Sequence, residues 1–167
     1  MEMALRSWHQ QDLNALLNLA NDIEIARFMA NRFPHPYTKE AGENFIKMAI
    51  NSKTSKMWAI DINGELAGGI GLHPQEDILC KNAEIGYWLA TKYWGNGIMS
   101  DAVMQTVDWG FEHMDISRIF GRVFGNNLRS PRVLLKCGFV KEAEFKQTIF
   151  KNNEYLDELI YGIRKNK

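Results

Sequence analysis

The segment from Ala83 to Met114 constrains the fold most strongly, because its hydrophobic period changes around two glycines. In "AEIGYWLA" (83–90) the side chains alternate between two faces, which is typical of a strand. Gly95 and Gly97 follow, and apolar residues then recur at helical spacing from Ile98 to Met114. A strand, a glycine turn and a helix in this order direct unpaired N–H groups and the positive end of a helix dipole at one point. The glycines alone leave two interpretations open: a tight turn, or a cradle for phosphate.

The segments before and after this one predict the rest of the architecture. The pattern predicts a strand at 3–8, helices at 9–22, 23–29 and 39–50, a hairpin at 56–72, a strand at 117–124, a helix at 131–137 and a closing hairpin at 139–163. We expect Thr38 to cap the helix that follows it, and Asn63-Gly64 to form the two-residue turn of the first hairpin. Ser130-Pro131 is interpreted as the cap and first residue of the helix at 131–137, which Gly138 ends.

The order of these elements predicts a fold class. Antiparallel hairpins combined with one strand–helix–strand crossover indicate an α/β (α+β) protein with a mixed, mostly antiparallel sheet of six to seven strands flanked by helices. The 167 residues carry no repeat or linker, so we expect residues 1–167 to form a single domain.

Composition excludes several classes of function. Twenty basic residues balance twenty acidic ones, so no global charge favours DNA or an anionic membrane. No run of 18 apolar residues and no secretion signal is visible, which predicts a cytoplasmic protein without a membrane partner. The two cysteines and four histidines show no ligand spacing, so we expect no metal. The glycine loop is followed by no GK[ST], which disfavours a nucleoside triphosphatase, and it does not match GxGxxG.

Three motifs together resemble one family. They are "AEIGYWLATKYWGNGIMSDAV", "NNLRSPRVLLKCGF" and "KNNEYLDELIYGI", in that order over nearly the whole chain. The sequence resembles the GCN5-related N-acetyltransferase (GNAT) superfamily, and within it the RimJ/RimL-like ribosomal-protein N-acetyltransferases. The resemblance implies the GNAT fold, acetyl-CoA as donor, and a primary amine as acceptor, either a protein N-terminus or a small molecule.

The resemblance also implies where the donor binds. The pyrophosphate is expected on the backbone N–H groups of Trp94, Gly95, Asn96, Gly97, Ile98, Met99 and Ser100, and the pantetheine arm along Trp88, Leu89 and Ala90. Asn127 is expected to hydrogen-bond the pantetheine or phosphate region. Trp94 and Met99 depart from the usual superfamily loop, where Gln or Arg begins it and Gly or Ala ends it. We expect the Met99 side chain to point into the helix packing.

Two residues are candidates for proton transfer. A protonated amine with a pKa of ~10 cannot attack a thioester, so a base is needed, and Glu84 matches a superfamily glutamate that acts through water. The other interpretation is that Glu84 is a solvated or ion-paired strand residue. Leu134 replaces the tyrosine that protonates the leaving thiolate in many relatives, and RimJ/RimL-type relatives suggest Ser130 instead, unless Ser130 is only a helix cap. No nucleophilic triad is visible and Cys137 is interpreted as core, so direct transfer in a ternary complex is expected.

Further predictions concern the acceptor site, the oligomeric state and the alternative function. Asp157 interrupts an apolar face, so we expect it to bond a backbone group or an arginine and to shape the acceptor site. Family analogy suggests a homodimer. A non-catalytic acyl-CoA-binding sensor or scaffold is the main alternative function, since the tyrosine is missing and Met99 is unusual.

Overall fold

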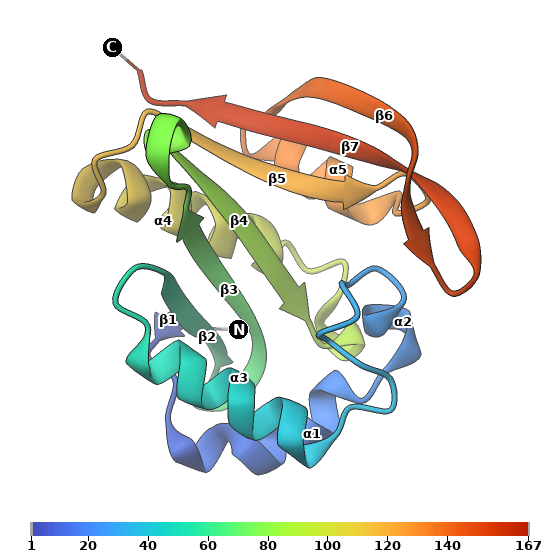
Figure 1. Cartoon of the computed structure of the whole chain (residues 1–167). Coiled ribbons are helices and arrows are strands. Elements are labelled where there is room, and N and C mark those ends of the chain that lie inside the picture. Colours follow the sequence, from blue (N-terminus) through green and yellow to red (C-terminus); the bar gives the residue numbers. More distant parts are fainter. Residues whose placement is uncertain (1, 167) are drawn as a thin grey trace. The chain divides into compact units, whose positions relative to one another are not determined.

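The computed structural model describes residues 2–166. Its elements are β1 (Met3–Arg6), η1 (Gln10–Asp12), α1 (Leu13–Ala20), α2 (Ile23–Ala26), α3 (Lys39–Asn51), β2 (Lys56–Ile62), β3 (Glu65–Pro74), η2 (Asp77–Leu79), β4 (Asn82–Leu89), η3 (Thr91–Tyr93), α4 (Ile98–His113), β5 (Arg118–Phe124), α5 (Arg129–Lys136), β6 (Val140–Lys151) and β7 (Glu154–Arg164). The strand order in the sheet is β1-β2-β3-β4-β5-β7-β6 (Figure 1). β4 and β5 are parallel, whereas the pairs β1–β2, β5–β7 and β6–β7 are antiparallel. The predicted fold class, a mixed sheet with flanking helices, is confirmed.

The chain divides into two compact units. The first comprises the chain up to Gly71 together with Tyr87–Ile98, and the second comprises Leu72–Gly86 together with the chain from Met99 onward. Whether the whole chain forms the single domain expected from its length stays a prediction.

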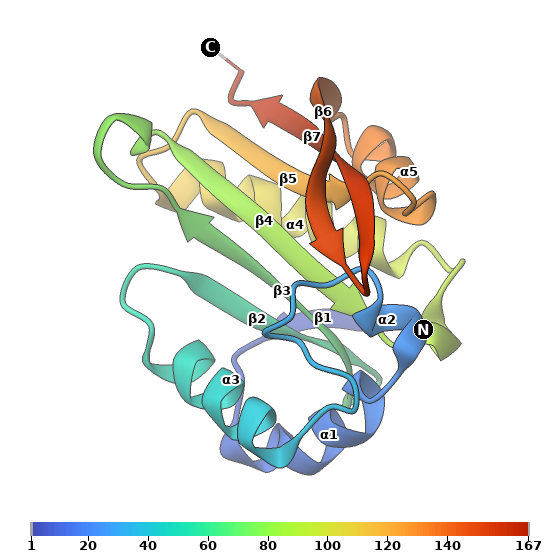
Figure 2. The same cartoon turned by 45° about the vertical axis from the view of Figure 1, so that its right-hand side comes forward.

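In the first unit, α1 and α3 lie side by side (Figure 2). Their apolar faces form a core with Trp8 and Trp88, in which Leu16 and Ile46 are fully buried. Gly68 explains how closely β3 approaches β4, because a Cβ at this position would lie 2.3 Å from the Trp88 carbonyl oxygen. The predicted Thr38 cap is confirmed, since its hydroxyl accepts from the Ala41 N–H at 3.1 Å. Asn63 and Gly64 both have positive φ, as a two-residue hairpin turn requires.

An ion-pair cluster fixes the start of the first unit. The Arg6 guanidinium donates to both carboxylate oxygens of Asp12, at 2.9 and 2.8 Å, and its Nε donates to Asp61 at 2.7 Å. Burial pushes the pKa of Asp12 upward, but the bonds from Arg6 and from the His9 N–H outweigh it and hold that pKa below its ordinary value. The cluster therefore ties β1, η1 and β2 together through ionised groups.

We expect Asp12→Asn to lower the free energy of unfolding by about 2 kcal/mol at neutral pH, because it leaves the Arg6 charge partly buried with one partner fewer. A carboxyl whose folded pKa is depressed stabilises the protein above its unfolded pKa and loses that contribution as pH falls through the folded value. The difference between wild type and Asp12→Asn should therefore shrink below about pH 4. Urea unfolding at a series of pH values measures this, and a difference that stays constant down to acid pH would contradict it.

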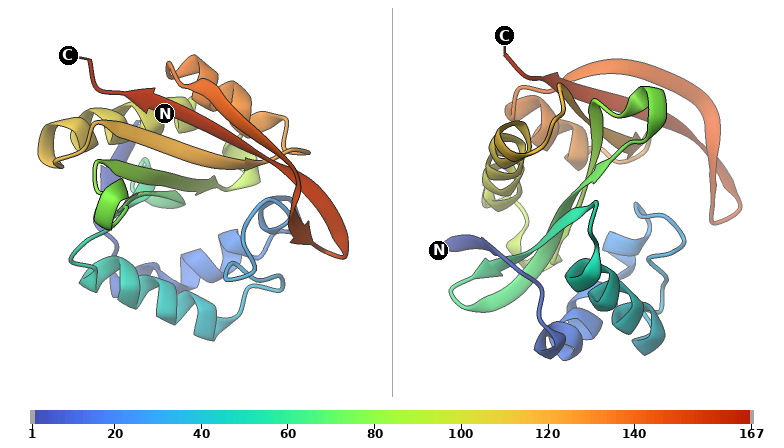
Figure 3. Two further views of the ribbon diagram at one scale, coloured as in Figure 1. Left: turned by 45° about the horizontal axis from the view of Figure 1, so that its top comes forward. Right: turned by 60° about the vertical axis from the view of Figure 1, so that its left-hand side comes forward.

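In the second unit, α4 and α5 pack on the same face of β5. A Cβ at Gly110 of α4 would lie 2.6 Å from a Leu72 methyl and 3.2 Å from an Ile119 methyl, so the helix approaches the sheet closely. Phe139, between α5 and β6, is 2% exposed and is among the largest fully buried side chains. Figure 3 shows β6 and β7 as a long twisted hairpin, which confirms the predicted closing hairpin.

The start of α5 differs from the prediction. The helix begins at Arg129 rather than Pro131, so Ser130 lies inside its first turn and is not the cap. The Asn127 side-chain oxygen accepts from the N–H groups of Arg129 and Ser130, both at 3.2 Å, and so takes the capping role from outside the helix. Pro131 is tolerated because its missing N–H falls among the first-turn groups that lack an intrahelical partner. Gly138, with φ +86°, ends the helix as predicted.

Candidate active site

The glycine loop between β4 and α4 has a backbone that depends on its glycines. Gly95 and Gly97 have φ of +80° and +79°, in the region that favours glycine. A Cβ at Gly95 would meet no atom within 4 Å, so the backbone conformation, and not crowding, requires glycine there. The first N–H groups of α4, beginning at Ile98, have no intrahelical acceptor. Loop and helix start together fit an anionic group such as a pyrophosphate.

Side chains of the loop hold its shape from within. The Trp94 indole Nε1 donates to the Leu89 carbonyl at 2.8 Å, and the Trp94 side chain packs against the core of the first unit. The Asn96 amide donates to the carbonyls of Tyr93 and Trp94, both at 3.2 Å. The departure at Trp94 is therefore structural. The Trp94 N–H, which was expected to bind the pyrophosphate, donates instead to the Thr91 carbonyl at 3.1 Å, so the N–H groups from Gly95 onward are the part of the loop that can bind an anion.

The end of β4 presents backbone rather than side chains. Trp88, Leu89 and Ala90 are all buried, with exposed fractions between 3% and 7%. The Trp88 ring lies 5.8 Å from the Phe33 ring and packs over Gly69 of β3. Any contact that these three residues make with a pantetheine arm must come chiefly from their backbone groups.

The first turn of α4 is buried on its inner side. Met99 and Ser100 are 8% and 4% exposed, which confirms that the Met99 side chain points into the packing. The Cys137 thiol, at the end of α5, lies 3.4 Å from the Ser100 carbonyl oxygen. Burial raises the pKa of Cys137, so it stays a thiol at neutral pH and is a poor nucleophile.

Glu84 lies on β4, in register with Phe120 of β5, at the last of three parallel pairs; both strands continue beyond this pair. Its side chain is 33% exposed, and one carboxylate oxygen lies 3.6 Å from the Arg122 Nε. Arg122 in turn donates to Glu158 of β7 at 2.8 Å. The interpretation of Glu84 as an ion-paired residue thus has a structural basis. The Glu84 side chain is nevertheless exposed enough to be reached by water.

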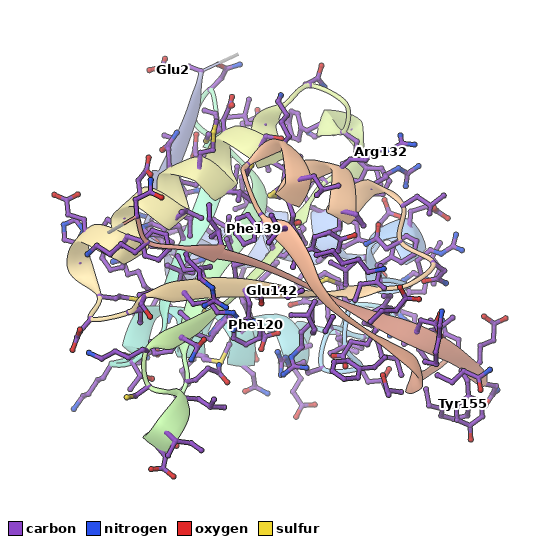
Figure 4. The ribbon with its side chains drawn as sticks, turned by 90° about the horizontal axis from the view of Figure 1, so that it is seen from above. Glu2, Phe120, Arg132, Phe139, Glu142 and Tyr155 are labelled. Carbon is purple, nitrogen blue, oxygen red and sulfur yellow. The ribbon has the colours of Figure 1, made fainter. Side chains whose placement is uncertain are left out.

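A pocket that the sequence did not predict lies on this strand face of the second unit. It has a volume of ≈ 360 Å³, and its lining includes Phe120, Phe145 and Ile160. Arg118 donates to Glu142 at 2.9 Å and to Asn82 at 2.9 Å, and its guanidinium lies over the Phe120 ring. Figure 4 shows Phe120 and Glu142 next to each other. Hydrogen bonding from Arg118 holds the pKa of Glu142 below its ordinary value, so the pair neutralises itself. The one sequence signal was the alternation of Arg118, Phe120 and Arg122 along β5.

The tyrosine position of the family is filled differently here. Leu134 is 1% exposed and lies close to Gly121 and Ile85, where a Cβ on Gly121 would be 3.5 Å from a Leu134 methyl. It therefore serves the packing of α5 on the sheet and brings no proton donor. Asn127 and Ser130 do come together, through the cap bond described above.

A second pocket, of ≈ 420 Å³, lies in the first unit beside η3. It is lined by the junction of α1 and α2, by His35 and by Thr91 and Lys92. The Thr91 hydroxyl donates to Asp22 at 3.0 Å, and the other Asp22 oxygen caps α2 through the Glu24 N–H. Both oxygens of Asp22 are thus engaged in holding the wall of the pocket.

Asp157 on β7 has the kind of partner that its sequence context predicts. It accepts from the Gln147 backbone N–H and from the Lys146 ammonium, both at 3.0 Å, and these bonds hold its pKa below the ordinary value. The backbone partner is confirmed, and the second partner is a lysine rather than an arginine. Its effect on the acceptor site stays a prediction.

Neither a cluster of metal ligands nor a membrane-spanning helix is found among residues 2–166. Among them no group of three or more His, Cys, Asp or Glu side chains is placed to hold a metal ion. No helix in that range is long and apolar enough to cross a membrane.

Comparison with known proteins identifies the family. The model of the acetyltransferase (GNAT) domain matches residues 2–140. The chain belongs to the GNAT acetyltransferase family. An uncharacterized N-acetyltransferase of Bacillus subtilis, YoaA, is 31% identical over 98% of this chain and 93% of its own length. The ribosomal-protein-serine acetyltransferase of Escherichia coli is 35% identical over 65% of this chain and 60% of its own length.

Solved structures agree with this membership. A GNAT-family acetyltransferase from Bacillus anthracis superimposes with a TM-score of 0.86 at 26% identity, over 98% of this chain and 95% of its own. RimL, the ribosomal L7/L12 α-N-protein acetyltransferase solved in complex with coenzyme A, gives 0.85 at 25% identity, over 97% and 93%. The predictions of a GNAT acetyltransferase, of the RimL-like branch and of acetyl-CoA as donor are confirmed. The protein is an acetyl-CoA-dependent N-acetyltransferase.

Proposed function

We propose that this acetyltransferase binds acetyl-CoA through the glycine loop and passes its acetyl group directly to a primary amine, with Glu84 as the general base. The observation that carries the proposal is the positive φ of Gly95 and Gly97 directly before the N-terminus of a 16-residue helix. Backbone N–H groups of residues 95–100 would hold the pyrophosphate, because the Trp94 N–H already donates to the Thr91 carbonyl at 3.1 Å, and the backbone of Trp88–Ala90 would hold the pantetheine arm. Asn127 uses its oxygen as a helix cap, so its NH₂ group remains to donate to the cofactor.

Acetyl-CoA supplies an activated acyl group and a thiolate leaving group. The contribution of the chain is to remove a proton from the amine, and Glu84 is half-buried yet open to the water through which it would act. The Ser130 hydroxyl, near the Asn127 cap, is the proposed proton donor to the thiolate. Since the thiol of Cys137 is kept protonated by burial, a covalent acyl-enzyme through it is disfavoured.

For the acceptor we propose a protein N-terminal α-amine of the ribosomal-protein type. The relationship to the E. coli ribosomal-protein-serine acetyltransferase supports it. A small-molecule amine is the second candidate, because spermidine N(1)-acetyltransferase of E. coli is 24% identical over 90% of this chain. The ≈ 360 Å³ pocket beside Arg122 would take a neutral part of the acceptor, since its own charges are paired.

Release of free thiol from acetyl-CoA, measured across a panel of amines, tests the proposal. The panel comprises peptides with N-terminal Ser or Ala, polyamines, aminoglycosides and amino acids. We expect N-terminal peptides to accelerate thiol release most. If coenzyme A binds but no amine accelerates release, the chain is the acyl-CoA sensor or scaffold that the sequence left as the alternative.

The proposal extends to a cytoplasmic homodimer. The hairpin of β6 and β7 exposes Phe150 and Tyr155, whose rings lie 5.0 Å apart and are 57% and 67% exposed. Figure 4 shows Tyr155 at the far end of this hairpin. Such an aromatic pair is typical of an interface with another chain.

A further inference from the structure

Three charged side chains form a row across neighbouring strands of the second unit. They are Glu84 on β4, Arg122 on β5 and Glu158 on β7. Glu158 is 17% exposed, Glu84 is 33% exposed and Arg122 is 49% exposed, so the pair nearer to β7 is the drier one. All three lie on the strand face opposite to the one on which α5 packs, because Gly121 faces Leu134 and its neighbours on β5 face the other way.

The guanidinium is shared unequally between the two acids. Arg122 makes a 2.8 Å hydrogen bond with Glu158, whereas its Nε lies 3.6 Å from Glu84, beyond normal hydrogen-bond length. The Phe120 ring, 5.6 Å from the guanidinium, supports it from β5. The pKa of Arg122 is raised first by its bond to Glu158 and then by the charge of Glu84, against a lowering by burial. Arg122 is therefore hydrogen-bonded to Glu158 on β7, and it lies near Glu84 on β4 without a hydrogen bond of normal length to it.

The other charges of this face are engaged elsewhere. Arg118 is held by Glu142 and Asn82, and Arg164 also pairs with Glu142. On β6, Glu144 pairs with Lys141 and Lys146. The electrostatic environment of Glu84 is therefore set mainly by Arg122 and by Glu158, which holds Arg122.

We propose that Glu158 is a positioning residue for acetyl transfer, which keeps Arg122 from closing onto Glu84 and so preserves Glu84 as a base. This inference rests on the proposed role of Glu84. A cation in direct contact with a carboxylate lowers its basicity, and a nearby acid restores it. Glu158 acts through Arg122, because its 2.8 Å hydrogen bond holds the cation on the side of β7.

Glu158→Gln tests the inference, since the neutral amide keeps the shape of the side chain but holds a guanidinium less strongly than a carboxylate does. We expect kcat at pH 7 to fall by about tenfold, and most of the loss to disappear near about pH 9.5, where more of the amine is free. KM for acetyl-CoA should stay within about twofold, because none of the three residues belongs to the glycine loop. Glu154→Gln, an exposed charge removal on the same strand, is the matched control.

The decisive comparison uses the Arg122→Gln background. If Glu158 acts through Arg122, then adding Glu158→Gln to Arg122→Gln should change kcat at pH 7 by less than about twofold. A tenfold loss in both backgrounds, or a loss independent of pH, would overturn the proposal. Glu84→Gln distinguishes a failure of the proposed base from a failure of the proposed role of Glu158. If Glu84→Gln leaves the pH profile unchanged, the assignment of Glu84 as the base is wrong. If it changes the profile while Glu158→Gln does not, only the role of Glu158 is wrong.

Discussion

Replacing Gly97 by glutamate should abolish binding of coenzyme A. The residue has φ +79°, a conformation that costs a residue with a Cβ about 1 kcal/mol or more. The new carboxylate would also stand at the N-terminus of α4, where the exposed N–H groups and the helix dipole attract an anion, and would compete there with the pyrophosphate. We expect the dissociation constant of coenzyme A, measured by calorimetry, to rise by at least about 100-fold.

Gly64→Glu is the matched control for this variant. Gly64 also has a positive φ, at +88°, so a side chain there causes backbone strain similar to that at Gly97. A Cβ at Gly64 would meet no atom within 4 Å, and the residue lies in a hairpin turn rather than in the glycine loop. Both variants should lose folding stability, but only Gly97→Glu should lose affinity. Gly97→Ala adds the backbone strain without the charge, so its affinity for coenzyme A should lie between those of Gly97→Glu and Gly64→Glu. An unchanged affinity in Gly97→Glu would mean that the pyrophosphate binds elsewhere.

The parts of this structure that could be predicted are those fixed by local chemistry. Asn63-Gly64 forms its turn because both residues accept positive φ, and Thr38 caps α3 because its hydroxyl reaches the N–H of Ala41 within the same turn. The period of the apolar residues likewise identified β4 and α4 on either side of the glycine loop. Each of these depends on residues within a few positions of one another.

The parts that could not be predicted depend on which strands become neighbours. The sequence places Glu84, Arg122 and Glu158 up to 74 residues apart, and only the order β4-β5-β7 brings them into one row. The pair of Arg118 with Glu142 likewise depends on the order β5-β7-β6, in which β7 lies between the two strands that carry it. The start of α5 was misplaced for a local reason, because Ser130 and Asn127 are both good caps and the sequence does not show which one the backbone uses.

Glu84→Gln should lower kcat at neutral pH, by about tenfold with an N-terminal peptide and by more with an alkyl amine, and kcat should recover as pH rises. The amide cannot take a proton, whereas at higher pH the acceptor loses its proton to solvent and needs no base. The initial rate of thiol release, measured with saturating acetyl-CoA from about pH 6.5 to 10, gives the profile. Glu65→Gln, an exposed acid on β3, is the control and should match wild type. A Glu84→Gln profile parallel to that of wild type would remove Glu84 from the mechanism.

The pH at which Glu84→Gln recovers also distinguishes the acceptors. A protein N-terminal amine has a pKa of about 8, whereas an alkyl amine has one of about 10. With an N-terminal peptide roughly a tenth of the amine is already free at pH 7, so the loss should be modest and recovery should be complete near about pH 9. With a polyamine only about one molecule in a thousand is free at pH 7, so the loss should be larger and recovery should require about pH 10. Because both profiles come from one variant and one assay, their separation depends on the amine and not on the folding of the variant. Recovery at the same pH for both acceptors would mean that Glu84 affects a step other than deprotonation of the amine.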